Sequence, residues 1–228
     1  MRRRIRTFRR VPLVLHSMGM ELIEGAPAAP SRFWNHNTAY YRLVRRSVPR
    51  GSRDLLDVGC GRGRLARELS GPGRRVLGLD PSAEMIGAAK QANADVAGLE
   101  FDAGDFLTAR IEPDSFDFVG FVASLHHMDQ AGALAKAAEI LRPGGRVVVI
   151  GLARAVTLPE EIVSGLCAPV VWFNDMRPDF GGNGVVPVTE PVLGWHETRK
   201  LLCDALPGAR FRRRLYFRYS LVWTKPKS

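Results

Sequence analysis

Leu55-Leu56-Asp57-Val58-Gly59-Cys60-Gly61-Arg62-Gly63 is an apolar run that ends in three glycines at alternate positions. A short apolar run bounded by turn residues is typical of a strand that is buried on both faces. The glycines predict a tight turn into a helix, and the N–H groups at a helix start favour a negative group nearby. In an open parallel sheet this turn lies at the carboxyl end of its strand, where ligands bind.

Apolar strands and helices alternate along the chain after this turn. The pattern predicts strands at residues 55–58, 75–79, 99–101, 116–122 and 146–150, and helices at 32–48, at 64–69, from Ser82 onward and at 130–141. Such alternation implies an α/β fold with a parallel sheet and helices on both faces. Residues 190–206 predict a further helix, and adjacent strands at 209–217 and 219–224 predict an antiparallel pair that ends the sheet.

Length and composition indicate one globular domain. The chain has 228 residues, of which 46% are hydrophobic and 25% charged. We expect a domain over residues 31–228 after a basic leader and linker over residues 1–30. Six arginines and no acid within the first 17 residues fit either an export signal or translation that begins at Met18 or Met20.

No run approaches the roughly 20 apolar residues of a membrane span. The three cysteines, Cys60, Cys167 and Cys203, form neither a paired framework nor a metal spacing. Their use therefore fits a reducing cytoplasm, which is the predicted location.

The net charge of +10 is concentrated at the two ends of the chain. The last 30 residues hold nine basic side chains and one acid, whereas the middle of the chain is mildly acidic. A basic excess points to nucleic acid or an anionic surface. The run Arg212-Arg213-Arg214 lies on a predicted strand, however, where solvated strand faces explain it, so we expect no nucleic-acid partner.

The glycine spacing excludes two common phosphate sites. A dinucleotide fingerprint requires glycine where this chain has Arg64, and a P-loop requires Gly-Lys-Ser/Thr, which is missing. Instead, Asp57 precedes the first glycine, Asp80 ends the second strand where it can accept hydrogen bonds from a ribose diol, and Asp105 follows the third strand beside Phe106. Three acids and an aromatic side chain suit a nucleoside with a cationic tail that lacks phosphate.

Further stretches follow the glycine turn in order. They are Val76-Leu77-Gly78-Leu79-Asp80-Pro81-Ser82 with Met85, Gly104-Asp105-Phe106, Phe116-Asp117-Phe118-Val119 leading to Leu125-His126-His127-Met128, and Leu141-Arg142-Pro143-Gly144-Gly145-Arg146. Together with residues 55–63, they resemble the motifs of class I S-adenosylmethionine-dependent methyltransferases, in the small-molecule group called type 11 or type 25. The resemblance covers residues 50–151 and implies a Rossmann-like, doubly wound sheet of seven strands.

The resemblance also implies a set of S-adenosylmethionine-binding residues. Gly59 and Gly61 would approach the methionine carboxylate, Asp80 would hold the ribose hydroxyls, and Asp105 would take the adenine amino group. Phe106 and Met85 would pack on the adenine ring, and the backbone at Phe121 or Val122 would meet the methionine amino group. An N-terminal helix over residues 31–48 would close over the cofactor. The other predicted cofactor-binding residues are Tyr40, Tyr41, Asp57, Cys60, Pro81 and Gly104, although Tyr40 and Tyr41 could equally be core aromatics of an amphipathic helix.

The acceptor is expected to be a small molecule that is methylated on oxygen. A hydroxyl acceptor needs a base, and His126 or His127 follows the fourth strand, although either could be a structural residue at the strand end. A carboxylate acceptor needs no base. We expect a substrate-side insertion over residues 152–198. Its aromatic side chains suit a largely apolar pocket, although they could instead be core residues beneath a lid. The candidate substrate residues are Trp172, Phe173, Trp195 and His196.

Two alternatives remain open at this point. One is an RNA or DNA methyltransferase that uses the basic C-terminal strands. Against it, residues 121–124 read Phe-Val-Ala-Ser and lack the Asp/Asn-Pro-Pro-aromatic tetrad of enzymes that methylate base amines. The other is a protein that binds S-adenosylmethionine without catalysis.

Overall fold

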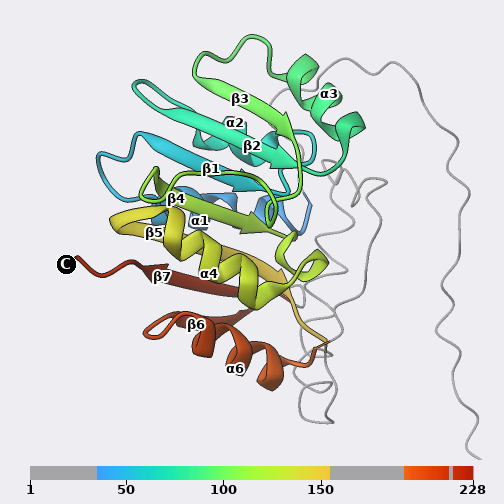
Figure 1. Ribbon diagram of the computed structural model, residues 1–228. Helices are drawn as coiled ribbons and strands as arrows, with labels where there is room; N and C mark the ends of the chain where they lie inside the picture. The colour runs from blue at the N-terminus through green and yellow to red at the C-terminus, as the bar shows by residue number, and fades with distance from the viewer. Residues whose placement is uncertain (1–34, 155–192, 216–217, 228) are drawn as a thin grey trace, which may run out of the picture.

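The computed structural model describes residues 35–154, 193–215 and 218–227 (Figure 1). The helical segments of these parts are η1 (Thr38–Tyr40), α1 (Tyr41–Ser47), α2 (Arg64–Leu69), α3 (Ala83–Ala92), η2 (Leu125–His127), α4 (Gln130–Ile140) and α6 (Trp195–Ala205). The strands are β1 (Asp54–Val58), β2 (Arg75–Asp80), β3 (Leu99–Ala103), β4 (Phe116–Val122), β5 (Leu141–Leu152), β6 (Arg210–Arg214) and β7 (Arg218–Thr224).

The seven strands form one sheet in the order β3-β2-β1-β4-β5-β7-β6. The first five run parallel to one another, and β7 runs antiparallel to both β5 and β6. This arrangement confirms the predicted Rossmann-like, doubly wound α/β fold and its antiparallel C-terminal strand pair. The order reverses between β1 and β4, which creates the crevice that ligands use in such sheets.

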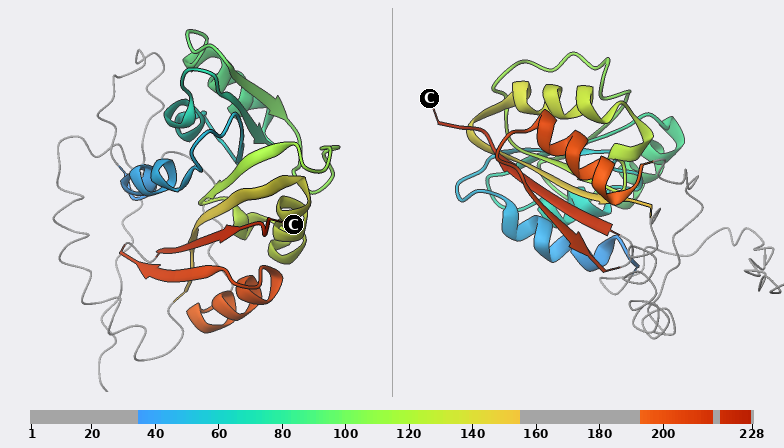
Figure 2. Two further views of the ribbon diagram at one scale, coloured as in Figure 1. Left: turned by 90° about the vertical axis from the view of Figure 1, so that its left-hand side faces the viewer. Right: turned by 90° about the horizontal axis from the view of Figure 1, so that it is seen from below.

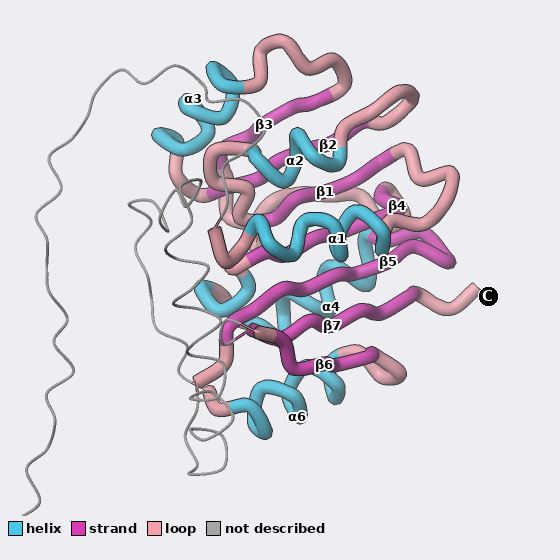
Figure 3. The backbone as a smooth tube through the Cα atoms, turned by 180° about the vertical axis from the view of Figure 1, so that it is seen from behind, coloured by secondary structure: helices cyan, strands magenta, loops and turns pink. Residues whose placement is uncertain are grey.

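Helices cover both faces of the sheet (Figures 2 and 3). One core cluster packs α1, α2 and α3 on the first face, and the other packs α4 and α6 on the second. Neighbouring residues of one strand enter different clusters: Leu55 belongs to the first and Leu56 to the second. Because side chains alternate along a strand, a continuous apolar run is what a sheet buried on both faces requires.

Most predicted elements are confirmed, with differences near two of them. The predicted helix at 32–48 is shorter where it is described, because the Asn35 side chain accepts hydrogen bonds from the N–H groups of Asn37 and Thr38 (2.9 and 2.8 Å). These bonds form a turn before η1, so α1 begins only at Tyr41. Strand β5 begins earlier than predicted, because Leu141 pairs with Phe116 before an irregularity in the ladder. The predicted N-cap Ser82 is confirmed by its hydrogen bond from the Met85 N–H (3.3 Å).

Among the described residues, no helix has the length and apolar character needed to cross a membrane.

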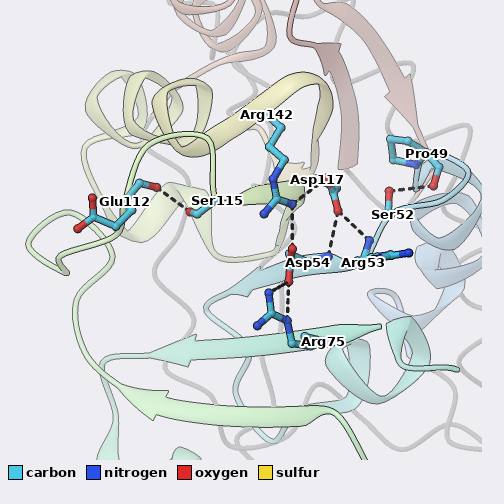
Figure 4. Close-up of polar contacts among 9 residues, drawn as sticks. All are labelled: Pro49, Ser52, Arg53, Asp54, Arg75, Glu112, Ser115, Asp117 and Arg142. Atoms are coloured by element: carbon cyan, nitrogen blue, oxygen red, sulfur yellow. Dashed lines mark hydrogen bonds and ion pairs between the residues drawn. The ribbon is translucent and has the colours of Figure 1, made fainter. Parts of the chain in front are cut away.

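A network of carboxylates and arginines ties the strands together at the amino edge of the sheet (Figure 4). Asp54, which is 8% exposed, forms ion pairs with Arg75 and with Arg142 (2.8 Å). Arg142 also contacts Asp117 (3.0 Å), whose other oxygen accepts from the backbone N–H groups of Arg53 and Asp54. Burial raises the pKa of Asp117, but these hydrogen bonds and Arg142 outweigh it, so the pKa lies below its ordinary value.

Arg142→Met is expected to lower the free energy of unfolding by about 1.5–3 kcal/mol, the usual contribution of hydrogen bonds to a charged group. A carboxyl group with a lowered pKa stabilises the fold above its ordinary pKa, and this contribution is lost as the pH falls through the folded-state value. The loss in Arg142→Met should therefore be larger at pH 7 than at pH 3. Urea denaturation at the two pH values measures it.

Arg45→Met is the matched control, because both side chains of the Arg45–Glu68 ion pair are exposed to solvent. Exposed ion pairs contribute about 0–1 kcal/mol. Equal losses in the two variants would contradict a stabilising role for the amino-edge network.

Candidate functional site

The glycine turn after β1 is held at the carboxyl edge of the sheet by β2. The N–H groups of Gly59 and Cys60 both donate to the Leu79 carbonyl (2.7 and 3.1 Å). The two carboxylate oxygens of Asp80 accept from the N–H groups of Gly61 and Ser82 (both 2.9 Å). A carboxylate offers about four acceptor positions. Asp80 therefore orders both turns and retains capacity to accept hydrogen bonds from a ligand.

The end of β4 lies directly against this turn. A Cβ placed on Gly59 would lie 2.3 Å from the Cβ of Ser124, and Gly59 has a left-handed φ of +71°. The Ser124 hydroxyl donates to the Val58 carbonyl (2.5 Å), which fastens the end of β4 to the end of β1. Ala123 also has a left-handed φ of 56°, which is uncommon for a residue with a side chain. Such outliers are concentrated at functional sites.

Asp57 is a buried carboxylate beneath the glycine turn. It is 2% exposed and accepts from the Ala66 N–H in the first turn of α2, whereas its Oδ2 has no hydrogen-bond partner among the described residues. Burial raises its pKa to about 7; the Ala66 hydrogen bond lowers the pKa, and Asp80 raises it. A buried carboxylate oxygen without a partner is costly, so it favours a ligand that carries a donor or a positive charge.

The N-terminal segment lies over the same edge. Burial and the nearby Asp57 raise the pKa of the Tyr41 hydroxyl, which stays protonated at neutral pH. Tyr40 instead reaches the turn between β6 and β7, where its hydroxyl donates to the Leu215 carbonyl (2.7 Å). Of the two tyrosines, Tyr41 is therefore the one near the acids of the crevice.

Two histidines follow β4 on η2. The ring centroids of His126 and His127 lie 4.0 Å apart, with His126 half-buried and His127 exposed. Burial, together with His127 and Arg218, lowers the pKa of His126 to about 4. Its Nδ1 has no hydrogen-bond partner among the described residues. The His126 imidazole is therefore neutral at pH 7.

Similarity to known proteins agrees with this geometry. Residues 56–149 match the family model of a methyltransferase domain. An uncharacterized methyltransferase of Mycobacterium bovis is 31% identical over 201 residues, which cover 85% of this chain and 98% of that protein. The chain belongs to the class I S-adenosylmethionine-dependent methyltransferases.

Two further relatives place this methyltransferase more broadly. A ubiquinone biosynthesis O-methyltransferase of Rhodopseudomonas palustris is 37% identical over 102 residues, 44% of this chain and 40% of that one. A crystal structure of an S-adenosylmethionine-dependent methyltransferase from Methanosarcina mazei has a TM-score of 0.58 at 18% identity, with 82% of this chain and 98% of that chain covered. The second likeness shows the shared fold.

The chemistry of the site fits S-adenosylmethionine. A Cβ on Gly61 would meet no atom within 4 Å, so the backbone of the turn is open to a ligand. The unpartnered Oδ2 of Asp57 suits the positive charge of the methionyl part, and Asp80 suits a diol. The acceptor groups of this edge are therefore of the kind that a cationic nucleoside binds.

Several other predicted cofactor residues lie along the same edge. Pro81 is exposed, and Met85 and Val122 are half-buried. The Gly104 N–H donates to the Asp80 carbonyl (3.0 Å), and one Asp105 oxygen accepts from the N–H groups of Leu107 and Thr108. The roles of these residues toward the cofactor stay predictions.

Three further predicted cofactor residues, Phe106, Phe121 and Cys60, also have buried side chains. The Phe106 ring is 3% exposed and packs edge-on against the Phe121 ring (5.6 Å between centroids) in the core beneath α4. This placement gives no support to the prediction that the Phe106 ring covers the adenine. Cys60 is also buried, in the other core cluster, so its backbone is the part that faces the turn.

The candidate substrate residues separate into three groups. Trp172 and Phe173 lie outside the described residues, as does most of the predicted 152–198 insertion. Trp195 is 4% exposed and belongs to the core beneath α6, with the Arg213 guanidinium 5.0 Å from its ring centroid. His196 is exposed on the first turn of α6. Trp195 is therefore a core residue in this structure, which is the alternative that the sequence left open.

Ser124, Ala123 and Arg218 lie at the carboxyl edge of the sheet and were not among the predicted site residues. A small residue directly after β4 is a usable signal for Ser124, because β4 and β1 are neighbours at the switch point of such sheets. The left-handed φ of Ala123 and the burial of Arg218 have no counterpart in the local sequence pattern.

Gly59→Ala is expected to lower the free energy of unfolding by roughly 2 kcal/mol or more, because overpacking against Ser124 adds to the cost of a left-handed residue with a side chain. Gly61→Ala is the matched control. It has a similar φ of +51° but no neighbour within 4 Å, so only the backbone cost of about 1–2 kcal/mol applies. Urea denaturation compares them, and equal losses would contradict the close approach of β1 and β4.

Asp57→Asn is expected to stabilise the methyltransferase more at pH 8 than at pH 5. The folded-state pKa of Asp57, about 7, lies above its ordinary value, so the folded protein binds the extra proton and wild-type stability falls as the pH rises toward 7. Asparagine removes this loss. Melting temperatures at the two pH values measure the effect, with the exposed Asp102→Asn as control.

The same Asp57→Asn variant should bind S-adenosylhomocysteine roughly 10–100-fold more weakly, because a charge-assisted hydrogen bond is lost. A stability difference between variant and wild type that does not change with pH would contradict the assignment of a buried, titrating carboxylate.

Proposed function

We propose that this methyltransferase methylates a hydroxyl group of a small molecule, with His126 as the base. The observation that carries the proposal is the neutral, half-buried His126 after the carboxyl end of β4. Its Nδ1 has no hydrogen-bond partner among the described residues. The similarity to a ubiquinone biosynthesis O-methyltransferase over 44% of the chain supports oxygen as the acceptor atom.

Residues from three strand ends and the N-terminal segment would hold the cofactor. Asp80 would bind the ribose hydroxyls, Asp57 the cationic methionyl part, and the open backbone at Gly61 the methionine carboxylate. Asp105 would take the adenine amino group, and Tyr41 would cover the site from α1. When bound, S-adenosylmethionine supplies a methyl group on a sulfonium, whose sulfur keeps the bonding electron pair as the methyl leaves.

The protein must then position the acceptor and remove its proton. Well-oriented reactants can gain about 7–11 kcal/mol from positioning alone. As the acceptor oxygen gains the methyl group, its proton passes to Nδ1 of His126. A pKa near 4 keeps this imidazole in its unprotonated form throughout the neutral range, but it also makes the imidazole a weaker base than a histidine that titrates near neutrality.

His126→Gln is expected to lower kcat for phenol and catechol acceptors by about 100-fold or more, the usual contribution of a general base. The exposed His127→Gln is the matched control and should retain most of the wild-type rate. Because His126 titrates near pH 4, the wild-type rate should not show the loss near pH 6.5 that an ordinary histidine base would cause. Production of S-adenosylhomocysteine measures the rate.

A separate measurement of cofactor binding accompanies this assay. S-adenosylmethionine should raise the melting temperature of the wild type and of both histidine variants, since a ligand of the native state stabilises by mass action. Asp80→Ala should lose the shift. No shift in the wild type would refute the cofactor site, and equal rates for His126→Gln and wild type would refute the base. If methyl groups were incorporated into RNA and not into small molecules, the result would favour a nucleic-acid methyltransferase.

A further inference from the structure

Two segments that are far apart in the sequence lie side by side on one face of the sheet (Figure 3). Just before α1, the Tyr40 hydroxyl donates to the Leu215 carbonyl (2.7 Å) at the end of β6. At the other end of α1, the Arg146 guanidinium donates to the Ser47 carbonyl (2.8 Å) and to the Thr224 hydroxyl of β7 (3.1 Å). These hydrogen bonds hold α1 along the β6–β7 hairpin.

Both segments are basic and contain no acid. Residues 35–53 include five arginines, residues 205–227 include seven basic side chains, and neither range has an Asp or a Glu. Two of these cations form ion pairs with acids of other elements. The surface that the two segments share therefore carries a positive charge that its own residues do not neutralise.

Three arginines of β6 point toward the side of the sheet that carries α1. Phe211 packs on the core of the other side, beneath α4 and α6. Because side chains alternate along a strand, Arg210, Arg212 and Arg214 point away from that core. Arg210 and Arg212 are exposed, and Arg214 is half-buried. The edge strand β6 therefore adds three cations to one surface.

Two arginines of α1 extend this surface. Arg42 and Arg46 are four residues apart, so they lie on the same side of the helix. Both are exposed, whereas Val44 between them is fully buried. None of these arginines forms an ion pair with a described residue. We call the surface made by the following five residues the α1–hairpin face: Arg42, Arg46, Arg210, Arg212 and Arg214.

An exposed apolar side chain lies at the end of this face. Leu215 follows Arg214 and is 44% exposed, and it is the one large hydrophobic residue of the described parts of the chain that is exposed. A leucine among arginines suits a surface that is anionic outside and apolar beneath, as a bilayer is. Single-stranded RNA is bound by stacking on aromatic side chains, and the described residues expose none.

The opposite end of the sheet has the opposite charge. β3 and β6 are the two edge strands of the sheet. β3 has the exposed acids Glu100 and Asp102, whereas β6 has the exposed Arg210 and Arg212. An anionic surface attracts one end of such a charge distribution and repels the other. The protein should therefore approach an anionic surface in one orientation, with the α1–hairpin face toward it.

We propose that the α1–hairpin face binds membranes that contain anionic phospholipids, with Leu215 inserted among the headgroups. Such binding increases with the apolar area that is inserted and with the attraction of basic side chains to anionic lipids. Leu215 begins the turn into β7, whose first residue pairs with Leu152 at the carboxyl end of β5. Binding therefore brings the ligand edge of the sheet, where the parallel strands end, close to the bilayer. This binding is separate from methyl transfer and does not depend on the identity of the acceptor.

Sedimentation with lipid vesicles tests the proposal on the full chain. The wild type should bind vesicles of phosphatidylcholine with about one third phosphatidylglycerol at least roughly tenfold more tightly than vesicles of phosphatidylcholine alone. Binding should weaken between about 0.1 M and 1 M salt, because the screening length falls from about 10 Å to about 3 Å. These comparisons need no variant.

A double substitution on α1 tests the face itself. Arg42→Gln/Arg46→Gln should bind the anionic vesicles roughly 10–30-fold more weakly, since each basic residue near such a surface strengthens binding by roughly fivefold. Lys90→Gln/Arg110→Gln is the matched control. It removes the same charge from α3 and from the loop between β3 and β4, and it should bind as the wild type does. All variants keep the arginines of residues 1–30, so this leader cannot cause a difference between them.

The hairpin supplies a second, independent pair of substitutions. Arg210→Gln/Arg212→Gln should lose as much vesicle binding as the α1 variant. Leu215→Ser should weaken binding roughly 3–10-fold at both salt concentrations, because the loss of inserted apolar area is not screened by salt. S-adenosylmethionine should raise the melting temperature of every variant as it does for the wild type. Loss of vesicle binding is then not a loss of the fold.

Three results would overturn the proposal. The first is equal binding of the wild type to neutral and anionic vesicles. The second is full vesicle binding by both double arginine variants of the α1–hairpin face. The third is binding to a single-stranded RNA without binding to anionic vesicles, which would make nucleic acid the partner of this face.

Discussion

The close approach of β1 and β4 determines the geometry of the site. Gly59 and Ser124 lie so near each other that no side chain fits at Gly59, and the Ser124 hydroxyl fastens the two strand ends. This contact fixes the glycine turn above Asp57 and sets the direction in which the chain leaves β4 toward His126. The cofactor acids and the proposed base thus depend on one contact between two neighbouring strands.

Buried polar groups have partners at the amino edge of the sheet, whereas at the carboxyl edge some of them lack partners among the described residues. At the amino edge, Asp54 and Asp117 are fully paired with arginines and backbone N–H groups. At the carboxyl edge, Asp57 and His126 each keep a buried polar atom without a partner among the described residues. Unpaired buried groups cost stability. The satisfied edge supports the fold, and the unsatisfied edge is the one that gains from a ligand.

The sequence predicted the sheet better than it predicted the site. Apolar runs such as Leu55–Val58 and Phe116–Val122 alternate with helices, a pattern typical of a parallel sheet covered on both faces. The positions of these strands and their parallel direction could therefore be predicted. The orientation of Phe106, Trp195 and Tyr40 depends on distant partners, namely Phe121, the α6 core and Leu215. Residue types and spacing indicate which residues reach an edge, but packing decides which side chains face it.

The basic C-terminal strands show why a net charge is a weak guide to a partner. Arg210, Arg212 and Arg213 are exposed on the edge strand β6, where charged side chains discourage pairing with another chain. Arg218 contributes the same unit of charge but is buried against Asn37 at the ligand edge. An exposed arginine acts on any anion through solvent, whereas a buried and oriented one acts on a group that fits it. The net charge therefore adds together exposed arginines and one buried arginine that packs against Asn37.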